Sequence, residues 1–393
     1  MKIAHVINYY QPLAYQENLL AKKQHEMSHQ VIIITSDRYN SGLKKLYKTN
    51  EKRIVGSGNF IENNINVVRL QTIVEIGTRV WLKGLKKALK EFNPDVVHCH
   101  DVFSILPVLA AVYKKSLGYR LVFDTHAADF NTDARSNWIR RLLYLLYRHT
   151  FGNIIRKRAD AIIAIGENES TFICREMGLA INEVGIIRMG ADSEMFKFSF
   201  NARKENRKYL GIQENELLII HTGKLSPNKD VDILIKAFLK VAKQCNNIKL
   251  LIIGEGDKDY LDYLKALAKS ADILNSIIFH PFVETSELAG YYSAADIAVW
   301  PGNPTISFFE AMSVGLPLIV CSDPYNIGTL SNKNAIFFKR GSIEELYKFL
   351  ICMIKDKNLR ETMAKKSREL IVKELNWDVL AKRFEKVYQG LPL

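Results

Sequence analysis

Short apolar runs alternate along the whole chain with segments in which apolar residues recur every three or four positions. This alternation predicts strands followed by helices, as in βαβ units around parallel sheets. The predicted strands of the first half are Ile3–Asn8, Val31–Thr35, Val67–Leu70, Val96–His98, Leu121–Asp124, Ala161–Ile165 and Val184–Arg188. Those of the second half are Leu217–Thr222, Lys249–Gly254, Ile277–His280, Ile297–Pro301, Leu318–Cys321 and Ala335–Phe338. Each set is sufficient for one doubly wound sheet.

A polar, charged stretch between the two sets divides the chain. We expect an α/β fold with two Rossmann-like doubly wound domains, 1–195 and 216–375, joined by a linker at 196–215. A C-terminal helix at 376–393 is long enough to cross back to the first domain. Because ligands bind outside the carboxyl ends of parallel strands, we expect the two domains to face each other across a cleft, with residues just after strands as the candidate site.

The charge of the chain points to an acidic partner. Its 393 residues include 55 Lys and Arg against 42 Asp and Glu, a net charge of +13. Nucleic acid, an anionic membrane or a phosphorylated small molecule would each suit this excess. No window of 18 uncharged apolar residues and no secretory pattern is evident, so we expect a cytoplasmic protein that could meet a membrane only at its surface.

The cysteines and histidines do not indicate a metal site or disulfides. The five cysteines are scattered without paired spacing (Cys99, Cys174, Cys245, Cys321 and Cys352). His98 and His100 alternate on a strand, but no further ligands accompany them in the sequence. We therefore expect no metal and no other cofactor.

The loop after Leu217–Thr222 has the residues of an anion site. Gly223 begins a turn, Lys224 and Lys229 lie five positions apart, and a helical pattern starts at Val231. Backbone N–H groups and two ammonium groups can converge there on phosphate oxygens, although an ordinary βα loop with solvated lysines is the alternative. A Gly254-x-Gly256 turn after a later strand is weaker evidence for the same site.

A third segment follows the strand Ile297–Pro301. Thr305 or Ser307 could cap a short helix whose free N–H groups receive a diphosphate. Glu310, one turn further, could accept hydrogen bonds from a ribose diol, or could be a simple capping glutamate.

These segments together resemble the retaining glycosyltransferase family 4, whose members have the GT-B fold and use nucleotide sugars. The resemblance rests on Gly223 to Asp230, Gly254 to Gly256, and Asn303 to Ile319 with its Glu-Ala-Met-x-x-Gly-x-Pro run, and it covers essentially the whole chain. It implies that Lys229 binds the donor diphosphate and that Glu310 binds the nucleotide ribose. The implied donor site comprises Gly223, Lys224, Lys229, Gly254, Gly256, Thr305, Ile306, Ser307 and Glu310.

Two positions on the donor side depart from the family pattern. Lys224 replaces the usual arginine and loses its two-pronged geometry. Gly302 stands where the family has a glutamate that contacts the donor sugar, which leaves the identity of the sugar and the activity open.

The first half resembles the acceptor side of the same family. Its first loop contains a Tyr-Gln-Glu-Asn variant (Tyr15 to Asn18) in place of two glycines, so we expect Tyr15, Gln16 and Glu17 to shape an acceptor pocket. A turn in which Glu17 only opens the next helix is the alternative. His126 matches the family histidine near the donor sugar, which implies a catalytic role beside Lys224 and Lys229, and Asp129 belongs to the same motif.

Basic residues gather in two stretches of the first half. Residues 135–158 carry seven Lys and Arg residues and no acid, interleaved with leucines, and residues 79–91 carry further lysines and Trp81. A solvated helix pair would account for the first stretch, but we favour docking of basic helices at 79–91 and 135–158 onto anionic phospholipid.

We therefore expect a glycosyltransferase that moves a hexose or N-acetylhexosamine, with retention, from a UDP- or GDP-sugar to a glycan or lipid-linked acceptor. It would lie on the inner face of the membrane and serve cell-surface polysaccharide or glycolipid synthesis. The alternatives are a non-catalytic scaffold that binds nucleotide or membrane, an inverting transferase with Asp101 or Asp129 as base, and a nucleotide-sugar epimerase. Nucleic acid is not an expected partner, because no stacking aromatics accompany the charge.

Overall fold

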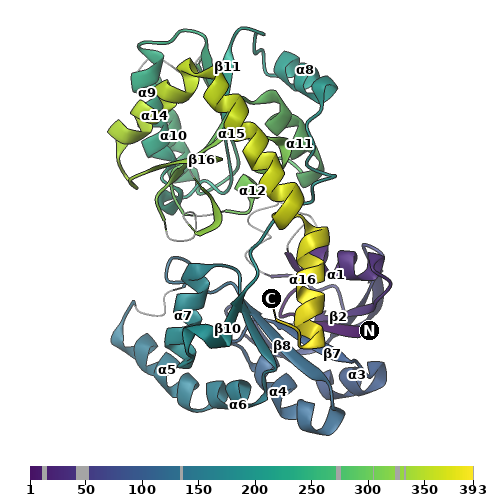
Figure 1. The fold of residues 1–393 in the computed structure, drawn as a ribbon. Helices are drawn as coiled ribbons and strands as arrows, with labels where there is room; N and C mark the ends of the chain where they lie inside the picture. The colour runs from purple at the N-terminus through teal and green to yellow at the C-terminus, as the bar shows by residue number, and fades with distance from the viewer. Residues whose placement is uncertain are drawn as a thin grey trace. The chain divides into compact units, whose positions relative to one another are not determined.

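The computed structural model describes residues 1–10, 16–40, 53–132, 136–270, 276–303, 305–323, 328–331 and 333–392. The chain forms two units (Figure 1). One comprises Met1–Arg188 and Trp377–Leu393, and the other comprises Met189–Asn376.

The first unit is built on an eight-stranded sheet with the strand order β10-β9-β8-β7-β1-β2-β4-β3. All neighbours are parallel except β3 and β4. The strands are β1 (Lys2–Val6), β2 (Gln30–Ser36), β3 (Gly58–Glu62), β4 (Ile65–Leu70), β7 (Val96–His100), β8 (Arg120–Thr125), β9 (Ala161–Ala164) and β10 (Val184–Ile186). Its helices are α1 (Gln16–Glu26), α3 (Leu85–Phe92), α4 (Ile105–Leu117), α5 (Trp138–His149), α6 (Phe151–Arg158), α7 (Glu167–Met177) and α16 (Trp377–Gln389).

The second unit contains a six-stranded parallel sheet with the order β13-β12-β11-β14-β15-β16. Its strands are β11 (Leu217–Thr222), β12 (Ile248–Ile253), β13 (Ile277–His280), β14 (Ile297–Trp300), β15 (Leu318–Cys321) and β16 (Ala335–Phe338). Its helices are α8 (Phe200–Tyr209), α9 (Val231–Ala242), α10 (Lys258–Ser270), α11 (Thr285–Ala294), α12 (Ser307–Val314), α14 (Ile343–Lys355) and α15 (Lys357–Leu370). The predicted α/β class with two Rossmann-like domains is confirmed.

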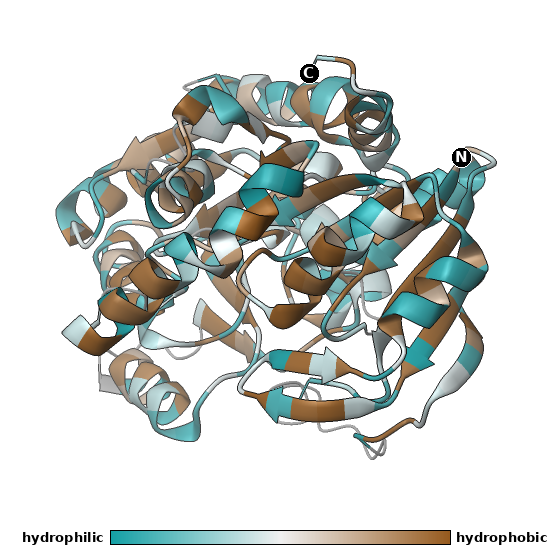
Figure 2. Ribbon diagram, turned by 90° about the horizontal axis from the view of Figure 1, so that it is seen from below, coloured by the Kyte–Doolittle hydropathy of each residue, from teal (hydrophilic) through white to brown (hydrophobic). Residues whose placement is uncertain are grey.

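The hydrophobic pattern explains why these elements form. The central strands are nearly continuous apolar runs because helices cover both faces of a parallel sheet; all of β2 after Gln30 is buried. Helix α9 buries Val231, Leu234, Ile235 and Phe238, the spacing of a single apolar face. In Figure 2 the strands carry long hydrophobic stretches, whereas many helices alternate between hydrophobic and hydrophilic residues.

Two segments differ from the simple pattern in the sequence. Residues 196–215, expected as a linker, contain α8, which packs on α11 within the second unit and whose Arg203 and Arg207 contact Asp296. Residues 79–91 are not one basic helix, because β6 (Arg79–Leu82) pairs antiparallel with β5 (Thr72–Ile76) and only α3 is helical. Residues of β6 are alternately exposed and buried, which is the period of a strand.

A network of buried polar side chains connects the sheet of the first unit with two helices. His5 hydrogen-bonds through Nδ1 to His100 Nε2 at 2.8 Å and through Nε2 to the Gln24 amide oxygen at 2.7 Å. His100 Nδ1 lies 2.7 Å from an Asp124 carboxylate oxygen. These contacts join β1, β7 and β8 to helix α1.

The same network holds the C-terminal helix. The Tyr388 hydroxyl in α16 lies 2.7 Å from His98 Nδ1 and accepts a hydrogen bond from Gln24, which is 364 residues away in the sequence. Figure 1 shows α16 beside α1. Unpaired polar groups are costly inside a protein, so this network favours one placement of α16 on the first unit.

Burial sets opposite pKa shifts within the network. Desolvation lowers the pKa of His5 well below its usual value and that of His98 to about 4. The pKa of His100 is raised because Asp124 outweighs its desolvation, and Glu17 adds to the effect. The pKa of Asp124 is held well below its usual value by His100 and His98 despite its burial. The favoured charge state is therefore a His100–Asp124 ion pair flanked by two neutral histidines.

We expect stability to fall on both sides of an optimum. A histidine with a lowered folded-state pKa contributes stability above its unfolded value of about 6.5 and loses it as the pH falls toward the folded value. His100 has the opposite sign, and its contribution is lost as the pH rises through its raised pKa. The urea midpoint of the wild type should therefore decline from pH 7 to pH 5, and His98→Asn, which takes up no proton, should decline less steeply.

His25→Asn is the matched control because His25 is exposed on α1. It should follow the slope of the wild type. Equal slopes for His98→Asn and wild type would show that His98 is not held neutral in the folded chain.

Candidate functional site

The donor-side candidates lie where the strand order of the second sheet reverses. Strand β11 lies between β12 and β14. After β11 the chain continues to β12 on one side of it, and the later strand β14 pairs with its other side. The loops that begin at Gly223, Gly254 and Pro301 all start at this edge. This is the position at which ligands bind in open α/β sheets.

Glycines allow two of these loops to touch backbone to backbone. A Cβ atom on Gly254 would lie 1.9 Å from the Gly223 carbonyl oxygen, and one on Gly256 would lie 1.7 Å from the Leu225 carbonyl oxygen. Gly223 and Gly254 also have φ values of +147° and +152°. The Leu225 N–H donates to the Glu255 carbonyl at 2.8 Å. No larger residue fits these positions without a shift of the loops.

Lys229 ends a short 3₁₀ turn, Pro227–Lys229, and its Nζ donates to the Asn303 carbonyl oxygen at 3.0 Å. Desolvation lowers the pKa of Lys229 to about 8, and the nearby Arg340 adds to the effect. Lys224 is exposed. The loop therefore presents one partly buried and one exposed ammonium group near the same strand end.

Arg340 holds the same loop and was missed by the sequence reasoning. Its guanidinium donates to the Asp230 carboxylate at 2.7 Å, the Asn303 side-chain oxygen at 2.7 Å and the Asn228 carbonyl at 3.0 Å. It follows β16, more than a hundred residues after Lys229, and no motif marks it. Only the tertiary structure brings this third cation to the site.

Gly302 has a clear structural reason. A Cβ atom there would lie 2.4 Å from the Lys229 carbonyl carbon and 2.6 Å from the Asn228 carbonyl oxygen. The Asn303 N–H donates to that Asn228 carbonyl at 3.1 Å. In this backbone arrangement a glutamate at position 302 would push the loop after β14 away from the loop that carries Lys229. The placement of Lys229 therefore depends on the glycine.

Ser307 joins the loop after β14 to the end of β11. Its hydroxyl donates to the Thr222 carbonyl oxygen at 3.1 Å and lies 3.1 Å from the Thr305 hydroxyl. The Trp300 indole N–H donates to the same Thr222 carbonyl at 2.9 Å. The expectation that Ser307 or Thr305 caps α12 is wrong: Ile306 occupies the cap position, with no side-chain cap.

Glu310 lies in the first turn of α12, where it is half-buried and contacts the side chain of Tyr292. The Tyr292 hydroxyl lies 2.7 Å from the Thr222 hydroxyl and donates to a Glu310 carboxylate oxygen at 3.4 Å. Desolvation raises the pKa of Glu310 to about 7. Near neutral pH the Glu310 carboxylate can therefore take up a proton easily, and it can also accept a hydrogen bond from a ligand.

The acceptor-side candidates lie at the corresponding edge of the first sheet, where β1 and β7 mark the reversal of strand order. His126 follows β8, and its Nε2 is 3.9 Å from an oxygen of the buried Asp124. The Asn131 amide donates to the His126 carbonyl at 2.7 Å and its oxygen accepts from the Ala128 N–H at 2.8 Å. These contacts fix the loop while the imidazole stays partly exposed.

The other acceptor-side candidates have different environments. Both Asp129 carboxylate oxygens pair with Arg175, at 2.6 and 2.9 Å, so this group is already engaged in an ion pair. Gln16 is buried at the start of α1, and neither of its amide atoms is hydrogen-bonded to another described residue. Glu17 lies close enough to His100 to raise the pKa of that histidine. Tyr15 lies outside the described residues, as does Arg135 of the basic stretch.

The structure adds a third histidine to the pair seen in the sequence. His5, His98 and His100 offer ligand atoms within 4.8 Å of one another, the geometry that a metal ion would need. Hydrogen bonds to one another, Gln24, Asp124 and Tyr388 already use most of these nitrogens. The absence of a metal therefore stays a prediction.

Two family models match the chain. The model for glycosyl transferases group 1 matches residues 202–370, and that for Glycosyltransferase Family 4 matches residues 18–195. An uncharacterized glycosyltransferase of Haemophilus influenzae is 32% identical over 286 residues, which cover 68% of this chain and 76% of the relative. The alpha-monoglucosyldiacylglycerol synthase of Acholeplasma laidlawii is 26% identical over 79% of each chain.

Solved structures agree on the fold. Anabaena Alr3699/HepE, crystallised in complex with UDP, has a TM-score of 0.78 with 16% identity, and the match covers all of both chains. At this identity the likeness concerns the fold alone. The family models and the Haemophilus relative go further, and on that basis the chain belongs to the glycosyltransferases, of the family 4 and GT-B type.

Proposed function

We propose that the protein transfers a hexose or N-acetylhexosamine, with retention, from a UDP- or GDP-sugar to a hydroxyl of a lipid-linked acceptor or glycan at an anionic membrane. Such a reaction serves glycolipid or cell-surface polysaccharide synthesis. The observation that carries the proposal is the gathering of glycine backbones, Lys229 and Glu310 at one edge of the second sheet. The Anabaena structure with UDP and the glycolipid synthase among the relatives support the donor and acceptor classes.

The chemistry assigned to the donor site is stabilisation of the leaving diphosphate. The bond between the anomeric carbon and the phosphate oxygen breaks, the acceptor oxygen bonds to the same carbon, and the acceptor proton passes to the leaving phosphate. Lys229, Lys224 and backbone N–H groups stabilise the negative charge as it develops. Glu310 accepts hydrogen bonds from the ribose diol, and His126 contacts the donor sugar during transfer. This scheme requires no metal.

Helix α5 supports the membrane part of the proposal. None of its residues is buried, and Leu142, Leu143, Leu145 and Leu146 are between 45% and 57% exposed. Residues 136–158 carry arginines and one lysine and no acidic residue. An exposed helix with leucines and arginines suits the boundary of an anionic bilayer. Within the described residues, no helix has the length and apolar character needed to cross a bilayer.

One nucleoside diphosphate should stabilise the folded chain more than the others. A ligand present at 100 times its Kd adds about 2.7 kcal/mol to the stability of the state that binds it. In a thermal-shift panel of UDP, GDP, ADP, CMP and dTDP, we expect UDP or GDP to raise Tm and both Lys229→Ala and Glu310→Ala to remove the rise.

Lys265→Ala is the control for loss of positive charge, because Lys265 is exposed on α10, two turns away from the Gly256 loop, and should keep the full shift. If no nucleotide raises Tm, or if Lys265→Ala loses the shift as well, the diphosphate site is not the one assigned here.

The affinity for the nucleotide should pass through a maximum between about pH 7 and pH 8. Below a pKa of about 7, Glu310 takes up a proton and loses acceptor strength toward the ribose. Above a pKa of about 8, Lys229 loses the charge that binds the diphosphate. Each limb falls by at most about tenfold per pH unit, since one proton is linked to binding.

Two conservative variants separate the limbs when Kd is measured by calorimetry. Lys229→Arg keeps its charge and should flatten the limb above pH 8, and Glu310→Gln should flatten the limb below pH 7. Protonation of the ligand itself affects all three proteins equally. A wild-type profile that both variants leave unchanged would contradict these roles.

Transfer to a lipid acceptor should retain the anomeric configuration of the donor sugar. The acceptors are phosphatidylglycerol vesicles that contain diacylglycerol or glycosyldiacylglycerol. They are incubated with nucleotide sugars that carry the nucleoside diphosphate identified above. Proton NMR of the product should show the donor anomer. His126→Ala should lower kcat about 100-fold, the scale of losing one transition-state contact, with the nucleotide Kd within twofold of wild type.

Replacing Arg140 and Arg141 by Gln tests the membrane contact in the same assay. We expect weaker flotation with anionic vesicles and slower transfer, with nucleotide binding preserved. A product with the inverted anomeric configuration would contradict the retaining mechanism. Full vesicle binding by the double variant would show that α5 is not part of the membrane contact.

A further inference from the structure

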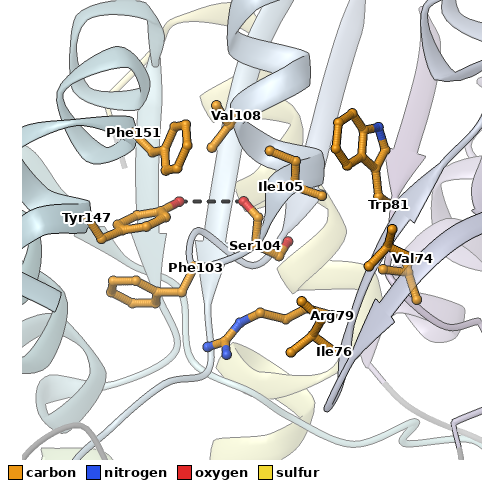
Figure 3. A pocket seen from close by; sticks show the side chains of 11 residues that line it. Val74, Ile76, Arg79, Trp81, Phe103, Ser104, Ile105, Val108, Tyr147 and Phe151 are labelled. Carbon is orange, nitrogen blue, oxygen red and sulfur yellow. Dashed lines mark hydrogen bonds between the residues drawn. The ribbon is translucent and has the colours of Figure 1, made fainter. Parts of the chain in front are cut away.

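The first unit contains an apolar pocket that the donor and acceptor assignments do not use. Its volume is about 320 Å³, within the range of small-molecule sites. Figure 3 shows side chains from the β5–β6 hairpin, the start of α4 and the α5–α6 region converging on it. The lining residues are Val74, Ile76, Arg79, Val80, Trp81, Phe103, Ser104, Ile105, Val108, Tyr147 and Phe151.

The mouth of the pocket is apolar and accessible. Val74, Trp81 and Phe151 are between 43% and 47% exposed, and Ile76 is 73% exposed. Phe151 begins α6 directly after α5, whose leucines are exposed along its length. The pocket therefore opens beside the helix that we assign to the membrane surface.

Its surroundings are positively charged. Arg79 is an exposed lining residue and lies at the edge of the pocket in Figure 3. The adjoining α5 and α6 carry Arg140, Arg141 and Arg148 and then Arg156, Lys157 and Arg158, without an acidic residue. Apolar walls with Arg79 at the edge and basic helices adjoining match a molecule with an apolar chain and an anionic headgroup.

The pocket also borders the acceptor edge of the sheet. Asn8, which follows β1, donates to the Ser104 hydroxyl at 3.4 Å, and its side-chain oxygen accepts from the Val80 N–H at 3.3 Å. Ser104 and Val80 both line the pocket. A chain held in the pocket would leave its headgroup close to Asn8.

We propose that this pocket binds one acyl chain of an anionic membrane lipid. The identification of that lipid as the acceptor rests on the proposed function. The pocket takes one chain out of the bilayer beside α5 and so keeps the headgroup at the carboxyl edge of the first sheet. Apolar contact supplies the affinity, and Arg79 together with the basic residues of α5 selects an anionic headgroup.

The test uses Trp81 as a reporter in the full chain. Trp300 and Trp377 are buried, so Trp138→Phe leaves Trp81 as the exposed tryptophan. The probe is lysophosphatidylglycerol with a dibrominated acyl chain, below its critical micelle concentration, because bromine quenches tryptophan on contact. We expect saturable quenching with one lipid per chain, and at least tenfold weaker binding of the lysophosphatidylcholine analogue.

Two isoleucine variants form a matched pair on this background. Ile76 lines the pocket and is 73% exposed, whereas Ile61 on β3 is 76% exposed and is not part of the lining. Ile76→Glu places a carboxylate against the acyl chain and should weaken binding at least tenfold. Ile61→Glu should stay within twofold.

Quenching that rises without saturation, equal binding of the two headgroups, or equal effects of the two glutamates would overturn the proposal. The nucleotide thermal shift of each variant keeps the two proposals apart. If the Trp138→Phe protein shows a full nucleotide shift but no saturable lipid binding, only the acyl-chain site is contradicted. Saturable lipid binding without any nucleotide shift contradicts only the transferase assignment.

Discussion

The close approach of backbones at the carboxyl edge of β11 is the constraint on which the proposed donor site depends. Gly254 and Gly256 lie against the carbonyls of Gly223 and Leu225, and Gly302 lies against the backbone of Asn228 and Lys229. Three loops that leave three neighbouring strands are thereby packed with almost no side chain between them. The Lys229 ammonium group, which donates to the Asn303 carbonyl, is in consequence held where these loops meet.

Packing of this kind removes water from the charged groups around it. Desolvation moves the pKa of Lys229 down to about 8 and that of Glu310 up to about 7, so both groups are close to losing their charge when no ligand is present. In the proposed donor site, a diphosphate would stabilise the charged form of the lysine and a ribose diol that of the carboxylate. Burial thus makes the site responsive to a ligand that carries both groups.

The first unit has a buried polar network in its interior and an exposed helix of leucines and arginines on its surface. Its buried histidines, Asp124 and Tyr388 form a hydrogen-bonded network that holds α1 and α16 on the sheet. On the outside, α5 exposes leucines and arginines with no buried residue of its own. The interior contacts the loop of His126 through Asp124. In the proposed function, the exposed helix meets the bilayer.

The sequence by itself determined the strand and helix alternation, the two Rossmann-like domains, the glycine and lysine loop and the exposed basic helix. These features are visible locally, because a helix or strand that buries one face or both faces has a characteristic spacing of apolar residues in the sequence. The Glu-Ala-Met run also located Glu310 correctly on a short helix after β14.

Only the tertiary structure decided which distant residues share a site. It placed Arg340 on the Lys229 loop, engaged Asp129 with Arg175, added His5 to the two histidines of β7 and paired β6 with β5. It also explained Gly302, whose missing side chain leaves room for a backbone more than seventy residues earlier. Such contacts have no signature in the sequence, since they depend on distances between segments that only packing brings together.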